Sequence, residues 1–270
     1  IDDVSVFKGT AFTLAQVQEL YNDGIPLDAT NHTQKANLVG YWRNRGTDTW
    51  TDDSTNTNDG TVNGSPDTIY FPKGSQAGRD SQGMVLTNTR SNEGLILDGV
   101  ADYVKVADAD SLDLTTSATW ALWMKQEAID VTAAILGKGI STNLVRFYTS
   151  SNGLFYFVIM DGSSNSGYFN YSTAISANTW HYLTVVYDGS LTDNADRLKV
   201  YVDSNQNTLT FSGTIPSSLL TNSEALFIGD ISSMIISSFN GEIDEVLVYN
   251  KALTSEEITK NYNAQKGRYQ

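Results

Sequence analysis

The chain has 270 residues, with 31 acidic and 17 basic side chains and no cysteine. Its net charge of −14 repels nucleic acid and anionic membrane surfaces, so neither is expected as a partner. The lack of cysteine excludes disulfides, thiolate metal sites and thiol catalysis. No apolar run approaches the ~18 residues of a membrane-spanning helix, so no membrane insertion is expected.

The chain begins with a segment that its C-terminal end repeats. Residues 1–24 read IDDVSVFKGTAFTLAQVQELYNDG, and residues 243–267 read IDEVLVYNKALTSEEITKNYNAQKG. In each copy, alternating valines predict a strand, and Thr13 or Thr254 begins a capping box that predicts a short helix. Because the repeat occurs once, at nearly domain-length separation, we interpret residues 1–24 as the closing strand and helix of a preceding repeat.

Residues 25–36 (IPLDATNHTQKA) lack periodicity and are predicted to form a linker. From residue 37 onward, short alternating runs are separated by turn dipeptides, among them Asn152–Gly153 and Asn240–Gly241. This pattern predicts an all-β antiparallel sandwich over residues 37–267, with two short helices confined to the repeated segments. The predicted strands span residues 38–43, 94–97, 103–106, 118–125, 133–138, 145–149, 154–160, 167–171, 180–187, 197–202, 226–229 and 241–249.

Several of these strands carry recognisable motifs. GLILDG at 94–99 with DYVKV at 102–106, WHYLTVVYDG at 180–189 and FNGEIDEVLVYN at 239–250 resemble the laminin-G-like jelly-roll domain of the concanavalin A-like lectin and glucanase group. The resemblance covers roughly residues 37–265. It implies a concanavalin A-like two-sheet sandwich of the kind found in adhesins, secreted carbohydrate-active proteins and phage tail proteins. An extracellular or virion-surface location, with neighbouring repeats of the same family in the parent chain, is then expected.

The resemblance favours a non-catalytic carbohydrate-binding or adhesion module of a phage tail or a secreted bacterial protein, with a glycan or polysaccharide as partner. Glycan binding needs exposed aromatic rings beside polar side chains. The candidate ligand-binding residues are Trp50, Arg146, Asp161, Tyr168 and Tyr171. Two alternatives stay open: a polysaccharide-cleaving enzyme on the same fold, and a structural spacer in a fibre or virion.

An enzyme would draw its catalytic acids from the closing strand, where Glu242 and Asp244 are the candidates. Retaining glucanases of this fold place their acids on one strand face, with the two carboxyl groups about 5–5.5 Å apart. Strand alternation places Glu242 and Asp244 on one face and Glu245 on the other, and Val246 stands where a third acid is needed. The pattern therefore argues against catalysis. His181, beside Trp180, is interpreted as a strand residue whose ring is hydrogen-bonded.

The resemblance also implies a structural calcium ion near the first and last core strands. Calcium binds carboxylate and carbonyl oxygens, so Asp98 and Asp102 on a turn and Asp244 on the closing strand are its candidate ligands. The alternative for such residues is that their carboxylates cap turns.

Overall fold

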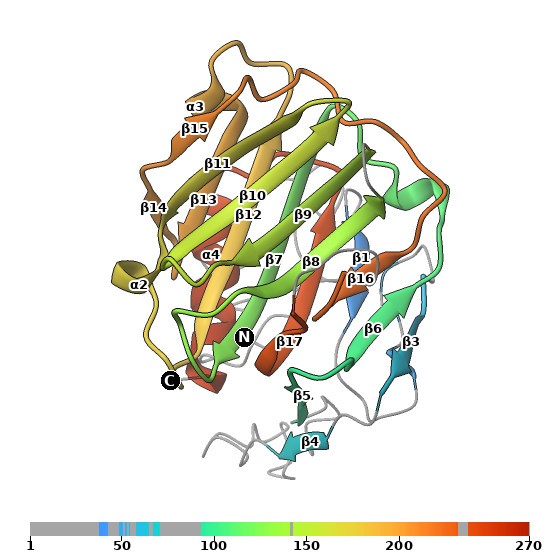
Figure 1. Ribbon diagram of the computed structural model, residues 1–270, viewed down its shortest axis with the longest axis vertical. Coiled ribbons are helices and arrows are strands. Elements are labelled where there is room, and N and C mark those ends of the chain that lie inside the picture. The colour runs from blue at the N-terminus through green and yellow to red at the C-terminus, as the bar shows by residue number, and fades with distance from the viewer. Residues whose placement is uncertain are drawn as a thin grey trace, which may run out of the picture.

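The computed structural model describes residues 38–42, 49–50, 52, 54, 58–64, 67–70, 93–140, 143–231 and 237–269. These residues form a two-layer antiparallel β-sandwich, which confirms the predicted fold class (Figure 1). The predicted preceding repeat at residues 1–24 and the linker at 25–36 lie outside the described residues, so both stay predictions.

The layer farther from the viewer in Figure 1, here called the back sheet, has eight strands in the described part of the chain. Seven follow the order β14-β13-β12-β7-β17-β5-β4, and β1 pairs with the end of β17 beyond β5. Their bounds are β1 (Leu38–Trp42), β4 (Asp67–Tyr70), β5 (Glu93–Asp98), β7 (Ser117–Gln126), β12 (His181–Asp188), β13 (Leu198–Val202), β14 (Asn205–Asn207) and β17 (Asn240–Tyr249).

The nearer layer, here called the front sheet, has nine strands in the described part of the chain, in the order β15-β11-β10-β9-β8-β16-β6-β3-β2. Their bounds are β2 (Thr49–Trp50), β3 (Gly60–Asn63), β6 (Tyr103–Val106), β8 (Ala133–Ile140), β9 (Asn143–Thr149), β10 (Leu154–Asp161), β11 (Ser164–Asn170), β15 (Thr210–Ser212) and β16 (Leu226–Ile228).

Described helices are few and short: η4 (Asp110–Leu112), α2 (Tyr171–Ala174), α3 (Asn194–Arg197), α4 (Ser255–Gln265) and η5 (Lys266–Arg268). The C-terminal helix prediction is confirmed, because the Thr254 side chain accepts from the Glu257 backbone N–H and the Glu257 carboxylate accepts from the Thr254 N–H. The expectation that helices occur only in the repeated segments is wrong, since α2 and α3 form single turns between strands. None of the described helices is long and apolar enough to cross a membrane.

The hydrophobic core lies between the two sheets. Strand alternation turns Leu198, Val200 and Val202 of β13 into it, as their spacing predicts. Across the core, Trp120 of the back sheet packs against Phe147 of the front sheet, with ring centroids 5.4 Å apart. Asn240–Gly241 is not a turn: both residues belong to β17 and pair with β5.

The outer face of the back sheet carries a second apolar cluster, which the C-terminal segment covers. We call α4, η5 and Tyr269 the C-terminal cover; in Figure 1, α4 lies behind the back sheet. The fully buried Trp123 of β7 stacks on Tyr269, with ring centroids 4.2 Å apart, and its indole N–H donates to Gln265 Oε1 at 2.8 Å. Tyr182 of β12 and Ile258 of α4 belong to the same cluster. The cover thus closes the middle of this face to ligands.

Candidate functional site

Three tyrosines form a row across the outer face of the front sheet. Tyr148 on β9 pairs directly with Tyr156 on β10, and Tyr156 pairs with Tyr168 on β11. Neighbouring ring centroids are 5.1 and 5.2 Å apart. Because side chains alternate along a strand, the buried Phe147 and Phe169 beside them point into the core and the tyrosines point away from it. We call Tyr148, Tyr156 and Tyr168 the tyrosine row.

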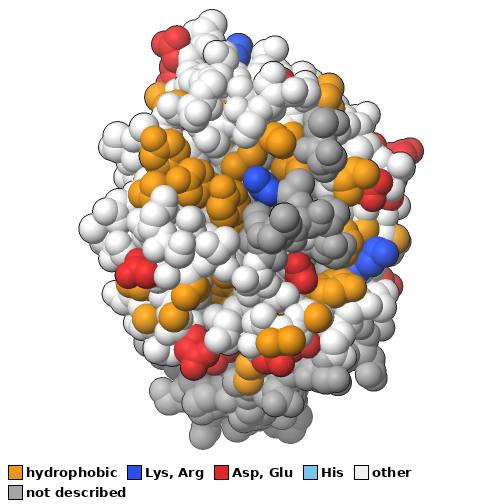
Figure 2. All heavy atoms as spheres, viewed as in Figure 1, with side chains coloured by type: hydrophobic (Ala, Val, Ile, Leu, Met, Phe, Trp, Pro, Cys, Tyr) orange, Lys and Arg blue, Asp and Glu red, His pale blue; other side chains and the backbone are white. Residues whose placement is uncertain are grey.

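Each ring of the tyrosine row is partly exposed, so the row offers both apolar and polar surface. A tyrosine ring presents an apolar body and a hydroxyl tip, which suits a ligand that has C–H faces and hydroxyl groups. The Asn152 side-chain amide donates to the Tyr156 hydroxyl at 3.4 Å and adds a polar group at one end of β10. In Figure 2, hydrophobic side chains gather on this face over β9, β10 and β11, with a basic side chain beside them.

Arg146 adjoins the tyrosine row on β9. Its guanidinium carbon lies 5.0 Å from the centre of the Tyr148 ring, which is a cation–π contact. Burial lowers the pKa of Arg146 from its ordinary value and raises that of the Tyr148 hydroxyl. Opposite Arg146, Gly137 lacks a side chain, and a Cβ there would lie 2.9 Å from Ile231 Cδ1. The glycine therefore lets Ile231 pack onto the sheet beside Arg146.

The predicted ligand-binding residues do not all reach this face. Arg146 and Tyr168 lie on it, and Asp161 lies at the end of β10, where its carboxylate accepts from the Asn165 amide at 3.0 Å. The Trp50 backbone belongs to β2, but its side chain is outside the described residues.

Tyr171 does not fit the role predicted for it. It is fully buried, its hydroxyl donates to Gln126 Oε1 at 2.7 Å, and burial raises its pKa strongly. The predicted strand 167–171 ends one residue early, because Asn170 caps α2 and turns Tyr171 into the core. The structure therefore gives this ring no surface for a ligand.

The candidate catalytic acids of β17 are held in ion pairs. Glu242 and Asp244 share the outer face of the back sheet, as predicted, and pair with Lys125 at 2.5 Å and with Arg268 at 2.9 Å, respectively. The Tyr269 hydroxyl also donates to Asp244 Oδ2 at 2.7 Å. These carboxylates are engaged with the fold, and β17 offers no open acid pair of the kind that glycoside cleavage uses.

The prediction that Glu245 faces the opposite side is wrong. The pairing of β17 with β7 shifts register between Asp244 and Leu247, and Glu245 has a left-handed backbone with φ of +50°. This bulge turns the Glu245 carboxylate toward the same guanidinium, 2.7 Å from Arg268 Nη1. Asp244 and Glu245 are 0% and 1% exposed, so one arginine compensates two buried acids.

This cluster predicts a dependence of stability on pH. Burial, the largest effect, raises the pKa of Asp244 to about 6, against the attraction of Arg268. Because the folded state then binds this proton more tightly than the unfolded state, the group's stabilisation is complete below pH ~4 and is lost as the pH rises through 6. We expect the unfolding free energy of the wild type, minus that of Asp244→Asn, to fall by about 1–3 kcal/mol between pH 4 and 7. Urea titrations of both proteins across this range measure it, and a flat or rising difference contradicts the assignment.

The proposed calcium ligands do not form one site. Asp98 Oδ1 accepts from the Val100 N–H at 2.7 Å, Asp102 Oδ2 accepts from the Asp98 N–H at 3.4 Å, and Asp244 pairs with Arg268. The first two contacts are those of the turn-capping alternative. In the described ranges, no three His, Cys, Asp or Glu side chains are grouped to hold a metal ion. The three residues therefore do not fit a shared calcium ion.

His181 has the structural role that its strand position predicts. Its Nδ1 lies 2.6 Å from Asp203 Oδ2, and its Nε2 accepts from the Ser176 backbone N–H at 3.1 Å. Both ring nitrogens are thus engaged within the fold.

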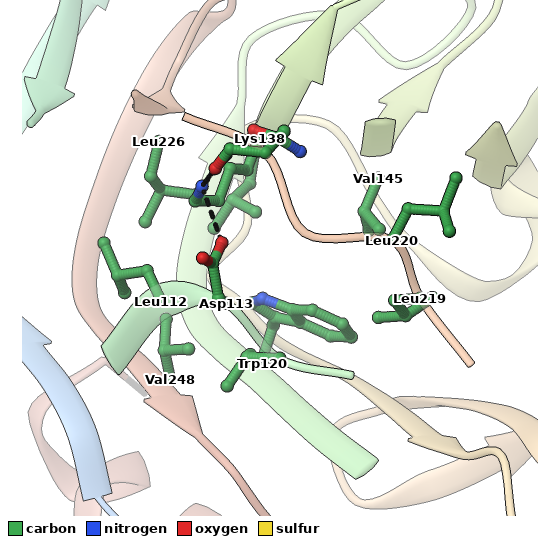
Figure 3. A pocket seen from close by; sticks show the side chains of 12 residues that line it. Leu112, Asp113, Trp120, Lys138, Val145, Leu219, Leu220, Leu226 and Val248 are labelled. Carbon is green, nitrogen blue, oxygen red and sulfur yellow. Dashed lines mark hydrogen bonds and ion pairs between the residues drawn. The ribbon is translucent and has the colours of Figure 1, made fainter. Parts of the chain in front are cut away.

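A small pocket opens between the sheets and is too small for a sugar (Figure 3). Trp120 and Val145 line it, and Lys138 Nζ within it contacts Asp113 at 3.2 Å and the Asn222 carbonyl at 2.8 Å. Its volume of about 30 Å³ is room for about two water molecules. The tyrosine row therefore remains the better candidate for a ligand surface.

Two packed antiparallel sheets of this topology define a lectin-type jelly-roll sandwich. The chain belongs to the concanavalin A-like lectin and glucanase superfamily, whose model matches residues 98–259. A search of curated proteins finds no match.

Solved structures with the same fold include sugar-binding and receptor-binding domains. Domain 4 of AbnA, an extracellular arabinanase from Geobacillus stearothermophilus in complex with arabinotriose, is 18% identical with a TM-score of 0.56; the match covers 83% of this chain and 98% of that domain. The receptor binding domain of botulinum neurotoxin D is 13% identical with a TM-score of 0.57, with 86% and 53% covered. The binding domain of Paraclostridial Mosquitocidal Protein 1 is 14% identical with a TM-score of 0.56, with 86% and 53% covered. The chain thus spans about half the length of the toxin domains that it matches.

Proposed function

We propose that this chain is a non-catalytic carbohydrate-binding module that holds a glycan on the outer face of the front sheet. The observation that carries the proposal is the tyrosine row with Arg146, on a face that the C-terminal cover leaves open. The superfamily and the arabinotriose complex of the AbnA domain support a sugar as the ligand of this architecture.

The row suits a chain of sugars better than a single ring. Its three tyrosines stand on three adjacent strands, and strands lie about 4.8 Å apart, so the row extends about 10 Å across the sheet. The three rings are partly exposed and do not line the small pocket between the sheets. An extended polysaccharide can lie across such a face, and this is the ligand we propose.

We further propose an extracellular setting, either on a secreted bacterial protein or on a virion such as a phage tail. The extracellular arabinanase and the toxin binding domains support this setting through their shared fold. The three residues named as calcium ligands do not form one site. Whether ligand binding depends on calcium stays a prediction, which the comparison of calcium with chelator below tests.

The test is a glycan array followed by polysaccharide pull-down, each run with calcium and with chelator. We expect binding to at least one polysaccharide, and at least tenfold weaker binding, about 1.4 kcal/mol, when Tyr156→Ala removes the central ring. Tyr103→Ala is the matched control, because Tyr103 lies on β6 and is separated from β9 by β8 and β16. If the protein binds no glycan with calcium or with chelator, the proposal is wrong and the structural-spacer alternative is favoured.

A further inference from the structure

Two rows of cross-strand partners on the front sheet's outer face differ in charge from the chain as a whole. The chain has 31 acidic and 17 basic residues, yet these two rows contain two basic residues and no acid. The first row holds Thr210, Tyr168, Tyr156, Tyr148 and Ala134, and the second holds Ser212, Ser166, Val158, Arg146, Gly137, Phe227, Lys105 and Thr61.

Each of these two cations lies over an aromatic ring of the same face. Arg146 is stacked on Tyr148, and Lys105 Nζ lies 5.8 Å from the centre of the Phe227 ring. Arg146 is the one that adjoins the tyrosine row, so a sugar on the row lies beside its guanidinium. The stacking limits the positions that this side chain adopts, and less conformational entropy is therefore lost when it binds a ligand.

A guanidinium in this position matches an anion better than a hydroxyl. Its planar array of N–H donors fits a carboxylate or a sulfate with two parallel hydrogen bonds. Arg146 is also half-buried, so an opposite charge beside it interacts more strongly than it does in open water. Acids outside these two rows that lie beyond about 8 Å repel an anionic ligand only weakly, because salt screens their charges at physiological ionic strength.

We infer that the glycan site takes an anionic polysaccharide, whose carboxylate or sulfate ester groups pair with Arg146 while its rings lie along the tyrosine row. This inference rests on the proposed function. It assigns the two parts of the face different tasks: the tyrosines contribute affinity for any extended sugar chain, and Arg146 contributes the preference for charge.

The test compares matched polysaccharides by titration calorimetry: polygalacturonate against its methyl ester, and dextran sulfate against dextran. We expect at least one anionic member to bind tenfold or more tightly than its neutral counterpart, and the two pairs distinguish a carboxylate from a sulfate ligand. Arg146→Gln is expected to abolish that preference and Arg146→Lys to keep part of it. Tyr156→Ala weakens binding of both members of a pair, and Lys260→Gln, on the exposed surface of α4, changes neither.

The outcomes separate the two proposals. Equal binding of both members of each pair, tighter binding of the neutral members, or a preference that survives Arg146→Gln overturns the inference while the glycan-binding proposal stands. Absence of binding to every polysaccharide here and on the array overturns both. A melting temperature of Arg146→Gln within a few degrees of the wild type shows that the variant is folded, and Arg146→Lys supplies the readout if it is not.

Discussion

Replacing Arg268 with alanine is expected to cost about 3–5 kcal/mol of stability at pH 7, because two buried carboxylates then lose their cation. Arg268 pairs with Asp244 at 2.9 Å and with Glu245 at 2.7 Å, and its side chain is 10% exposed. The penalty should be smaller at pH 5 than at pH 7, since the pKa of Asp244 is raised to about 6 and its protonation removes one of the two uncompensated charges. Urea unfolding at pH 7 and pH 5 measures both the loss and its dependence on pH.

Lys260→Ala is the matched control for this substitution. Lys260 pairs with Glu256 on the surface of α4, with side chains 63% and 78% exposed, and such pairs contribute about 0–1 kcal/mol. If Arg268→Ala destabilises the protein no more than Lys260→Ala does, Arg268 does not stabilise the buried carboxylates of Asp244 and Glu245.

The second large effect is expected at Trp123, which joins the back sheet to the C-terminal cover. Trp123→Ala should cost about 3–5 kcal/mol, because it removes a fully buried ring from contact with Tyr182, Tyr262 and Tyr269. It also leaves Gln265 without its indole donor. The free energy of unfolding measures the loss, and amide exchange should quicken in α4 more than in β7 as the cover detaches.

Trp123→Phe separates packing from hydrogen bonding. Phenylalanine retains an aromatic ring but cannot donate to Gln265, so we expect a smaller loss, on the order of 1–2 kcal/mol. Unchanged exchange in α4 after Trp123→Ala would mean that the cover is held by other contacts.

The sandwich could be predicted from the sequence because its determinants are local. Alternation in β13 and the capping box at Thr254 depend on residues close together in the chain, and both take the predicted form. The bulge at Glu245 could not be predicted in this way. A one-residue irregularity in strand pairing reverses the face of the next side chain, and its stabilisation comes from Arg268, 23 residues further along the chain.

The candidate site was only partly predictable for a related reason. Tyr168 and Arg146 have polar or aromatic neighbours in the sequence, but the tyrosine row exists only through the register of three strands. Phe147 and Phe157 face the core, and side chains alternate along a strand, so Tyr148 and Tyr156 point outward. This much could be predicted from the sequence. Which tyrosines stand opposite one another depends on the register of the strands, and a slip of two residues would change the partners while keeping the same side chains buried.

The placement of the glycan on the front sheet is tested most directly by NMR: an oligosaccharide that the array identifies is added to the labelled protein, and the chemical-shift changes are mapped. We expect the largest changes at Tyr148, Tyr156, Tyr168 and Arg146, and little change in the residues of the C-terminal cover. Changes centred on the cover, or on the pocket around Lys138, with the tyrosine row unaffected, would contradict the placement of the glycan on the front sheet.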